Sequence, residues 1–150
     1  MSDTEMKSAM QKGVLLNIGS YNRLKKYAEA GGKACSIRLV PNIGDGLHAR
    51  VTTGHTESKF GISTAHLTQI IELKESYGLK VEGIHMHIGS GIRKPENMMN
   101  AMKRLLELSI HFPDLRFINF GGGFPIAYNF GEHNFDIVEF GKAASTLLKD

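Results

Sequence analysis

The sequence predicts an α/β protein built on a parallel β-sheet, and three observations lead to this fold class. Short apolar runs of strand length alternate with longer segments of helical periodicity. The apolar runs are continuous, as expected of strands that are buried on both faces. Glycine-rich turns follow two of these runs, where α/β proteins bind their ligands. An open doubly wound sheet and a (β/α)8 barrel both fit, and the length of 150 residues favours the open sheet, since a full barrel needs roughly 200 residues or more.

Composition and charge describe a single globular domain over residues 1–150. The 41% hydrophobic and 22% charged fractions are ordinary, and the net charge of +3 is a mild excess. The basic residues are spread out, and the densest group fits a solvated helix face, so no nucleic-acid partner is expected. No apolar segment approaches the ~18–20 residues of a membrane span, and no signal peptide opens the chain, so we expect a cytoplasmic protein without membrane contact. The single cysteine, Cys35, lies in an apolar run and is expected to be a buried, inert thiol.

Capping and stop residues define the expected elements. In chain order we expect a helix over 3–12, a strand over 14–18, a helix over 21–30, a strand over 34–40, a long loop over 41–58, a helix over 64–77, a strand over 80–87, a helix over 95–112, a strand over 115–119 and a helix over 136–148. Ser2 or Asp3 can cap the first helix. Ser20 can cap the second, which the Gly31–Gly32 pair ends.

The later helices follow from the same signals. Ser63 or Thr64 can cap the third helix, which Gly78 ends, and Pro95 suits the first turn of the fourth. The apolar stripe of the fourth helix is expected to be Met98, Met102, Leu105, Leu106 and Ile110. Methionines at this spacing predict core filling. The loop over 41–58 is long for a compact domain, and such loops are often functional.

Two histidines precede the first glycine-rich turn. His85 and His87 are two residues apart on the predicted strand, so their side chains share a face. Such a pair can bind zinc or another metal in a hydrolase. A site of that kind needs further His or Asp ligands at strand ends, and the other strands supply only Arg38 and Asn119. The alternative is that one or both histidines are satisfied polar residues of the interior.

The two glycine-rich turns predict an anion site. Ser90, with the amides of Gly89 and Gly91, can form an anion-binding concavity. The triplet 121–123 can do the same, because a backbone without Cβ atoms can approach a phosphate closely. Since both turns follow consecutive parallel strands, we expect them side by side at the carboxyl-end rim. Neither fits the GxxxxGK[ST] or GxGxxG motifs of nucleotide-binding proteins.

These segments resemble a known family. GIHMHIGSG at 83–91 and NFGGGFPIAY at 119–128 are similar to motifs of the pyridoxal-phosphate-dependent decarboxylases of the alanine-racemase-like fold. SIRLVPN at 36–42 and TTGHTESKFGI at 52–62 resemble their R-x-N-P and TG-x-x-x-SKFGI segments. Within this family the likeness is greatest to the diaminopimelate decarboxylases of lysine biosynthesis. The ornithine and arginine decarboxylases match the TG-x-x-x-SKFGI segment less well.

The resemblance implies pyridoxal 5′-phosphate as the cofactor and assigns residues to it. His87 corresponds to the imidazole that stacks on the pyridine ring, and Ser90 to the hydroxyl that contacts the phosphate. Arg38 corresponds to an arginine that points into the barrel near the cofactor. The glycine loop whose amides hold the phosphate corresponds to Gly121, Gly122 and Gly123. His85 has no role by this match and is expected to pack.

The resemblance also implies which parts of the site the 150 residues lack. The family's Schiff-base lysine, its E-P-G-R segment and its C-terminal β-domain have no counterpart here, so no catalytic residue is assigned. We therefore expect about four consecutive βα units of a (β/α)8 barrel, as a gene fragment or truncated piece that is inactive alone and self-associates. The family is homodimeric and acts on amino acids as small-molecule substrates, and Lys59 is expected to serve structure or subunit contacts. The alternative is a non-catalytic, decarboxylase-like module for binding or regulation.

Overall fold

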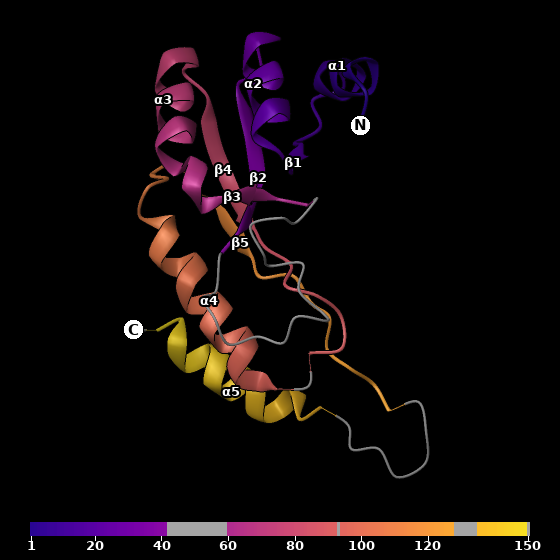
Figure 1. Cartoon of the computed structure of the whole chain (residues 1–150), viewed down its shortest axis with the longest axis vertical. Coiled ribbons are helices and arrows are strands. Elements are labelled where there is room, and N and C mark those ends of the chain that lie inside the picture. Colours follow the sequence, from indigo (N-terminus) through magenta and orange to yellow (C-terminus); the bar gives the residue numbers. More distant parts are fainter. Residues whose placement is uncertain (42–59, 93, 128–134, 150) are drawn as a thin grey trace.

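The computed structural model describes residues 1–41, 60–92, 94–127 and 135–149 (Figure 1). In chain order its elements are α1 (Asp3–Gln11), β1 (Asn17–Ile18), α2 (Tyr21–Glu29), β2 (Ala34–Val40), β3 (Ile62–Ser63), the short 3-10 helix η1 (Thr64–His66), α3 (Leu67–Tyr77), β4 (Lys80–His85), α4 (Pro95–Ser109), β5 (Phe117–Asn119) and α5 (Ile137–Leu147). The expected alternation of strands and helices is confirmed. The expected loop over 41–58 lies outside the described residues except for Pro41.

The sheet order follows the chain order. β1 pairs with β2, β2 with β4 and β4 with β5, all in parallel, and the short β3 pairs with the carboxyl end of β2. The strands β1, β2, β4 and β5 are therefore neighbours in chain order, as in a barrel wall, whereas a doubly wound sheet reverses its order at a switch point. The amide of Gly61 donates to the carbonyl oxygen of Gly19 (3.0 Å), so β3 begins where β1 ends. The strand order agrees with βα units of a barrel, rather than with the open sheet that length alone favours.

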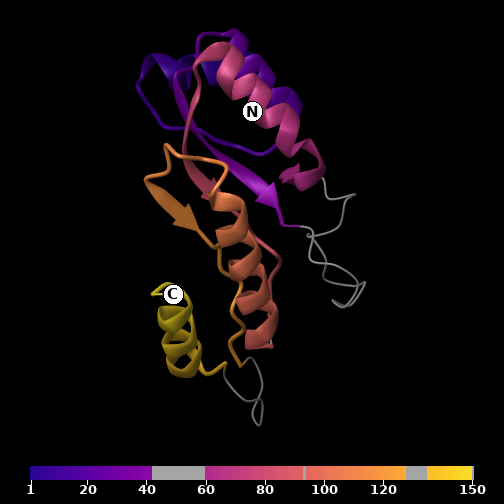
Figure 2. The same cartoon turned by 90° about the vertical axis from the view of Figure 1, so that its left-hand side faces the viewer.

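The two faces of this sheet differ in character. Isoleucines align across β1, β2, β4 and β5, and Ile18, Ile37 and Ile84 among them are fully buried against the helices. The residues that alternate with them belong to the other face and are largely polar: Asn17, Ser36, Arg38, His85 and Asn119. Figures 1 and 2 show α2 and α3 side by side along the strands. One face of the sheet thus forms the core, and the other carries the polar residues.

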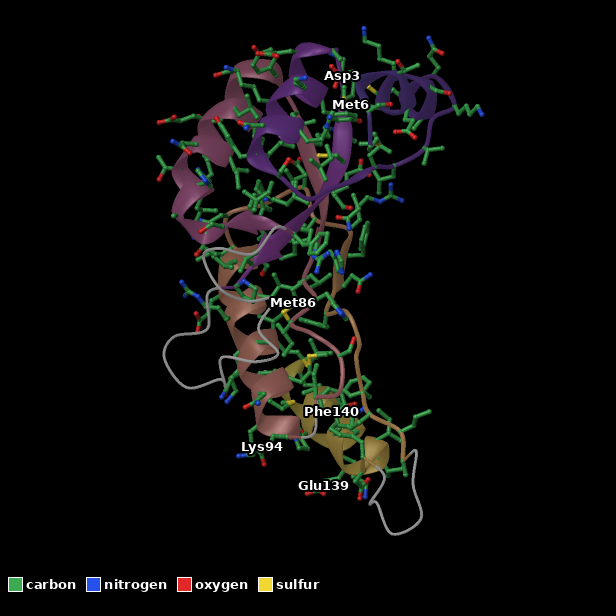
Figure 3. All side chains as sticks on the ribbon, turned by 45° about the vertical axis from the view of Figure 1, so that its right-hand side comes forward. Asp3, Met6, Met86, Lys94, Glu139 and Phe140 are labelled. Atoms are coloured by element: carbon green, nitrogen blue, oxygen red, sulfur yellow. The ribbon has the colours of Figure 1, made fainter. Side chains whose placement is uncertain are left out.

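Local signals explain the first helices. Ser2 and Glu5 form a reciprocal capping box at the start of α1, and the Ser20 hydroxyl accepts from the amide of Arg23 to cap α2. Asp3 and Met6 project from α1 (Figure 3), and Asp3 pairs with Arg23 of α2 while Met6 is buried. These contacts fasten α1 to α2.

Some details differ from the sequence-based expectations. Ile110 was expected in the apolar stripe of α4 but is 78% exposed, because the helix ends at Ser109 and Ile110 is its C-cap. Leu108 is buried instead. β4 ends at His85 rather than at residue 87, and β3 was not predicted at all.

The strand expected over 14–18 is only Asn17–Ile18, and Val14 and Leu15 are exposed. Other sequence-based features agree with the structure. Gly78 ends α3 in the left-handed conformation, with φ 60°. Cys35 is buried, and this burial, with a smaller effect of the Glu82 carboxylate, raises the pKa of its thiol to about 12. The predicted burial of this thiol is thus confirmed, and its raised pKa agrees with the expected low reactivity. In the part of the chain that the structure describes, every helix is too short or too polar to cross a membrane.

Candidate functional site

The carboxyl ends of β4 and β5 bring the two glycine-rich turns together. The amide of Met86 donates to the carbonyl oxygen of Asn119 (2.9 Å), and the amide of Ile92 donates to the carbonyl oxygen of Gly123 (3.0 Å). The turn over 86–92 and the turn over 121–123 are therefore joined at both ends. Their predicted position, side by side at one rim of the sheet, is confirmed. Met86 itself is fully buried and belongs to the hydrophobic core that the buried face of α4 also lines (Figure 3).

Two glycines of the triplet permit this close approach. A Cβ atom on Gly121 would lie 2.5 Å from the carbonyl oxygen of Met86, and one on Gly123 would lie 2.0 Å from the carbonyl oxygen of Gly89. Both glycines also have positive φ angles, 78° and 103°, which other residues rarely adopt. Gly122 differs, because nothing lies within 4 Å of its Cβ position. The triplet thus packs through its outer glycines and leaves open space at the middle one.

The rim also gathers the histidine and the serine that the sequence singled out. The Cβ position of Gly121 is 3.2 Å from Nδ1 of His87, so this imidazole lies against the glycine loop. The Cβ position of Gly123 is 3.2 Å from Cα of Ser90, which is exposed. The His87 imidazole, the backbone of Ser90 and the open position at Gly122 therefore lie along the same glycine loop. Such a set suits a phosphate attached to a flat ring.

Arg38 connects the sheet to this rim. It aligns with His85 across β2 and β4, and its Nη2 donates to the carbonyl oxygen of His87 (3.4 Å). Its guanidinium carbon lies 5.5 Å from the ring centroid of Phe60, within cation–π range. Burial lowers the pKa of Arg38, yet a guanidinium remains charged in proteins. A fixed positive charge thus stands next to the histidine turn.

A hydrogen-bonded chain on the polar face was not predicted. Nδ2 of Asn17 lies 2.8 Å from Nδ1 of His85, and the hydroxyl of Ser36 donates to Oδ1 of Asn17 (3.0 Å). Burial, and to a smaller degree Arg38 and His87, lower the pKa of His85. Sequence reasoning gave His85 no role beyond packing. The available signal was that Asn17, Ser36 and His85 occupy the same face of consecutive strands.

Aromatic packing holds the end of the glycine loop. Phe124 follows the triplet, and its ring centroid lies 4.9 Å from that of Phe135 and 4.9 Å from that of Phe140 on α5. Phe140 projects from α5 in Figure 3. Aromatic rings at such distances attract each other beyond simple burial. The helix after β5 is thereby tied to the rim.

The metal hypothesis for His85 and His87 finds no further ligand in the described part of the chain. Over residues 1–41, 60–92, 94–127 and 135–149, no three His, Cys, Asp or Glu side chains are grouped so that they could hold a metal ion. The two histidines also have different surroundings. His85 faces Asn17 through Nδ1, whereas His87 lies against Gly121.

Comparison with known proteins places these features in a wider context. The family model described as "Pyridoxal-dependent decarboxylase, pyridoxal binding domain" matches residues 1–150. Diaminopimelate decarboxylase of Methanothermobacter thermautotrophicus is 35% identical over 99% of this chain and 36% of its own length. A crystal structure of diaminopimelate decarboxylase superposes with a TM-score of 0.83 at 26% identity, over 98% of this chain and 35% of that one. The Helicobacter pylori diaminopimelate decarboxylase complexed with L-lysine gives 0.78 at 27% identity, over 99% and 40%. The chain thus spans about a third of the length of the relatives it matches.

Proposed function

We propose, because this chain belongs to the pyridoxal-dependent decarboxylase family, that its rim binds the phosphate and ring of pyridoxal 5′-phosphate. The observation that carries the proposal is the contact between the two glycine-rich turns, with His87 beside Gly121 and open space at Gly122. A backbone without a Cβ atom can approach a phosphate oxygen closely. The residues present therefore fit the cofactor that characterises the family.

Each residue of the rim has a proposed task. The amides of Gly122 and Gly123 and the hydroxyl of Ser90 hold the phosphate, with Gly122 facing the open space. The amide of Gly121, which the resemblance also assigns to the phosphate, donates to Oδ1 of Asn119 (2.8 Å) and so shapes the loop. His87 stacks on the pyridine ring and fixes its plane. Arg38 holds the His87 carbonyl and adds a positive charge near an anionic ligand. None of these residues is proposed to form a covalent bond to the cofactor.

We further propose that the protein carrying this chain decarboxylates diaminopimelate to lysine. The support is that the chain is 35% identical to the archaeal diaminopimelate decarboxylase over nearly its whole length. When bound, pyridoxal phosphate supplies an electron-accepting ring for the electrons left by the departing carboxylate. The chain's own residues hold that ring and phosphate in one orientation. The substrate is tested by measuring how fast the protein that carries this chain releases carbon dioxide from diaminopimelate, ornithine and arginine. A preference for ornithine or arginine would overturn the proposed substrate.

The cofactor site is tested by calorimetry with three ligands. We expect pyridoxal phosphate to bind at one site, inorganic phosphate to compete with it, and unphosphorylated pyridoxal to bind more weakly, because the phosphate contributes charge-assisted hydrogen bonds. Ser90→Ala is expected to lower the affinity for inorganic phosphate roughly threefold to tenfold, which corresponds to the loss of about one hydrogen bond. Ser109→Ala, on α4, is the matched control. Binding that inorganic phosphate does not affect would contradict the proposal.

The location and assembly belong to the same proposal. A cytoplasmic protein that forms a homodimer and acts on a small-molecule amino-acid substrate is expected from the resemblance to the family. Sedimentation of the purified chain tests the self-association. A monomer at all concentrations would contradict the expectation that this chain associates with copies of itself.

A further inference from the structure

We propose that His85 is a second ligand-binding imidazole, which Asn17 and Ser36 hold so that its Nε2–H donates to an acceptor oxygen of the pyridoxal group. This inference rests on the proposed cofactor site and adds a residue to it. His85 would act beside His87 without stacking on the ring. Its task is to donate one hydrogen bond that fixes how the ring is turned.

The position of His85 in the sheet is the first argument. It is the last residue of β4, and it aligns with Arg38 on β2 and with Asn119 on β5. The amide of the next residue, Met86, bonds to the Asn119 carbonyl, and the following residue, His87, lies against the glycine loop. His85 therefore stands on the polar face of the sheet, at the point where the strands give way to the rim.

The hydrogen-bonded chain fixes which nitrogen carries the proton. The hydroxyl of Ser36, which is only 4% exposed, donates to Oδ1 of Asn17. The Asn17 amide oxygen thus faces Ser36, and its Nδ2 is directed to Nδ1 of His85, 2.8 Å away. An amide NH2 can only donate, so Nδ1 must accept and the proton of the neutral ring lies on Nε2. In the part of the chain that is described, Nε2 has no hydrogen-bond partner.

The charges around His85 favour the same state. The groups that face it are Asn17 from β1, Arg38 from β2, Asn119 from β5 and His87 beyond the end of β4. Arg38 carries a positive charge, which disfavours a second one on the neighbouring strand. Burial acts in the same direction and lowers the pKa of His85. A neutral donor beside a fixed cation can bind an oxygen acceptor without adding charge repulsion.

Nitrogen NMR of the histidine rings tests the protonation state directly. We expect the His85 ring, assigned by its loss in His85→Gln, to show the Nε2–H tautomer at neutral pH. In Asn17→Asp the carboxylate can only accept, so the proton is expected to move to Nδ1. A wild-type ring protonated on Nδ1, or one that stays charged at pH 7, would overturn the proposal.

A pair of substitutions tests the role in binding. The amide nitrogen of Gln reaches the position of Nε2, whereas that of Asn reaches the position of Nδ1. We therefore expect His85→Gln to keep most of the affinity for pyridoxal phosphate and His85→Asn to lose roughly threefold to tenfold, the value of about one hydrogen bond. Equal affinities in both variants and in the wild type would refute the role of His85.

Inorganic phosphate separates this inference from the proposed function. Both His85 variants are expected to bind it as the wild type does, because His85 is not part of the glycine rim. If the wild type fails to bind inorganic phosphate, the proposed cofactor site itself is wrong. If inorganic phosphate binds normally but His85→Asn does not change the affinity for pyridoxal phosphate, only the role proposed for His85 is wrong. Equal thermal unfolding of the two variants checks that both are folded.

Discussion

Nδ2 of Asn17 lies 2.8 Å from Nδ1 of His85, although 68 residues separate them in the sequence. The contact joins the first strand to the last residue of β4, across β2. It also places the His85 imidazole, whose pKa is lowered by burial and by Arg38, next to Arg38 in the row of residues that ends at the glycine rim. Side-chain hydrogen bonds between strands therefore cross the polar face of the sheet.

The lowered pKa of His85 predicts loss of stability in mild acid. The unfolded chain takes up a proton at this residue near pH 6.5, and the folded chain does so only at lower pH. Between these two values the unfolded state binds more protons, so the free energy of unfolding decreases as the pH falls below about 6.5. Urea denaturation at pH 7 and pH 5 measures this change. His85→Gln is expected to reduce the difference; the same difference in both proteins would contradict the prediction.

The glycine loop predicts opposite outcomes for neighbouring alanine substitutions. Gly123→Ala forces a Cβ atom to within 2.0 Å of the Gly89 carbonyl oxygen at a φ of 103°, so we expect a loss of about 1–3 kcal/mol in unfolding free energy. Gly122→Ala meets open space and is expected to change stability by less than about 0.5 kcal/mol. Its methyl group should nevertheless weaken phosphate binding. Thermal unfolding and phosphate titration of both variants check this, and a stable Gly123→Ala would refute it.

We expect cofactor binding to require the guanidinium group of Arg38 and not only its positive charge. It donates to the His87 carbonyl and lies over the Phe60 ring, and the ammonium of a lysine cannot reproduce both contacts. Arg38→Lys should therefore lower the affinity for pyridoxal phosphate roughly threefold to tenfold, as expected for the loss of one hydrogen bond. Arg104→Lys on the exposed side of α4 is the matched control. Full affinity in Arg38→Lys would show that charge alone is required.

The buried side chain of Met86 is expected to stabilise the two glycine-rich turns. It is fully buried, and its amide carries one of the bonds between the two turns. Met86→Ala should cost about 2–5 kcal/mol of unfolding free energy, because it leaves a cavity. Met86→Leu keeps the volume and should cost less than about 1.5 kcal/mol. Equal stability of the two variants, measured in urea, would mean that the site collapses freely around the deletion.

Local signals made much of this fold predictable. Ser2, Ser20 and Gly78 act at helix ends through bonds within a few residues, and such bonds can be inferred from sequence. The contact between the glycine turns was predictable too, because parallel strands bring their carboxyl ends to one edge. Ile110 was misplaced because periodicity continues past the residue at which α4 ends. The spacing of apolar residues does not show that the helix ends at Ser109.

The hydrogen-bonded chain of Ser36, Asn17 and His85 and the strand β3 were not predicted, because both arise from contacts between segments far apart in the sequence. Asn17 meets His85 only because β1 and β4 flank β2, and a single sequence does not give the register between strands. β3 has only the two residues Ile62 and Ser63, which is too short for a detectable pattern. The roles of the rim residues come from the family resemblance and stay predictions until ligand binding is measured.

Phosphorus NMR of pyridoxal phosphate tests the central claim most directly. With the wild-type chain we expect the resonance to shift on binding and to stop following the pH of the solution, because the glycine turns hold the phosphate in one charged state. Gly122→Ala, which meets no contact in the structure, should restore much of the free signal. A phosphate resonance that titrates in the presence of the wild-type chain as it does in free solution would contradict the account.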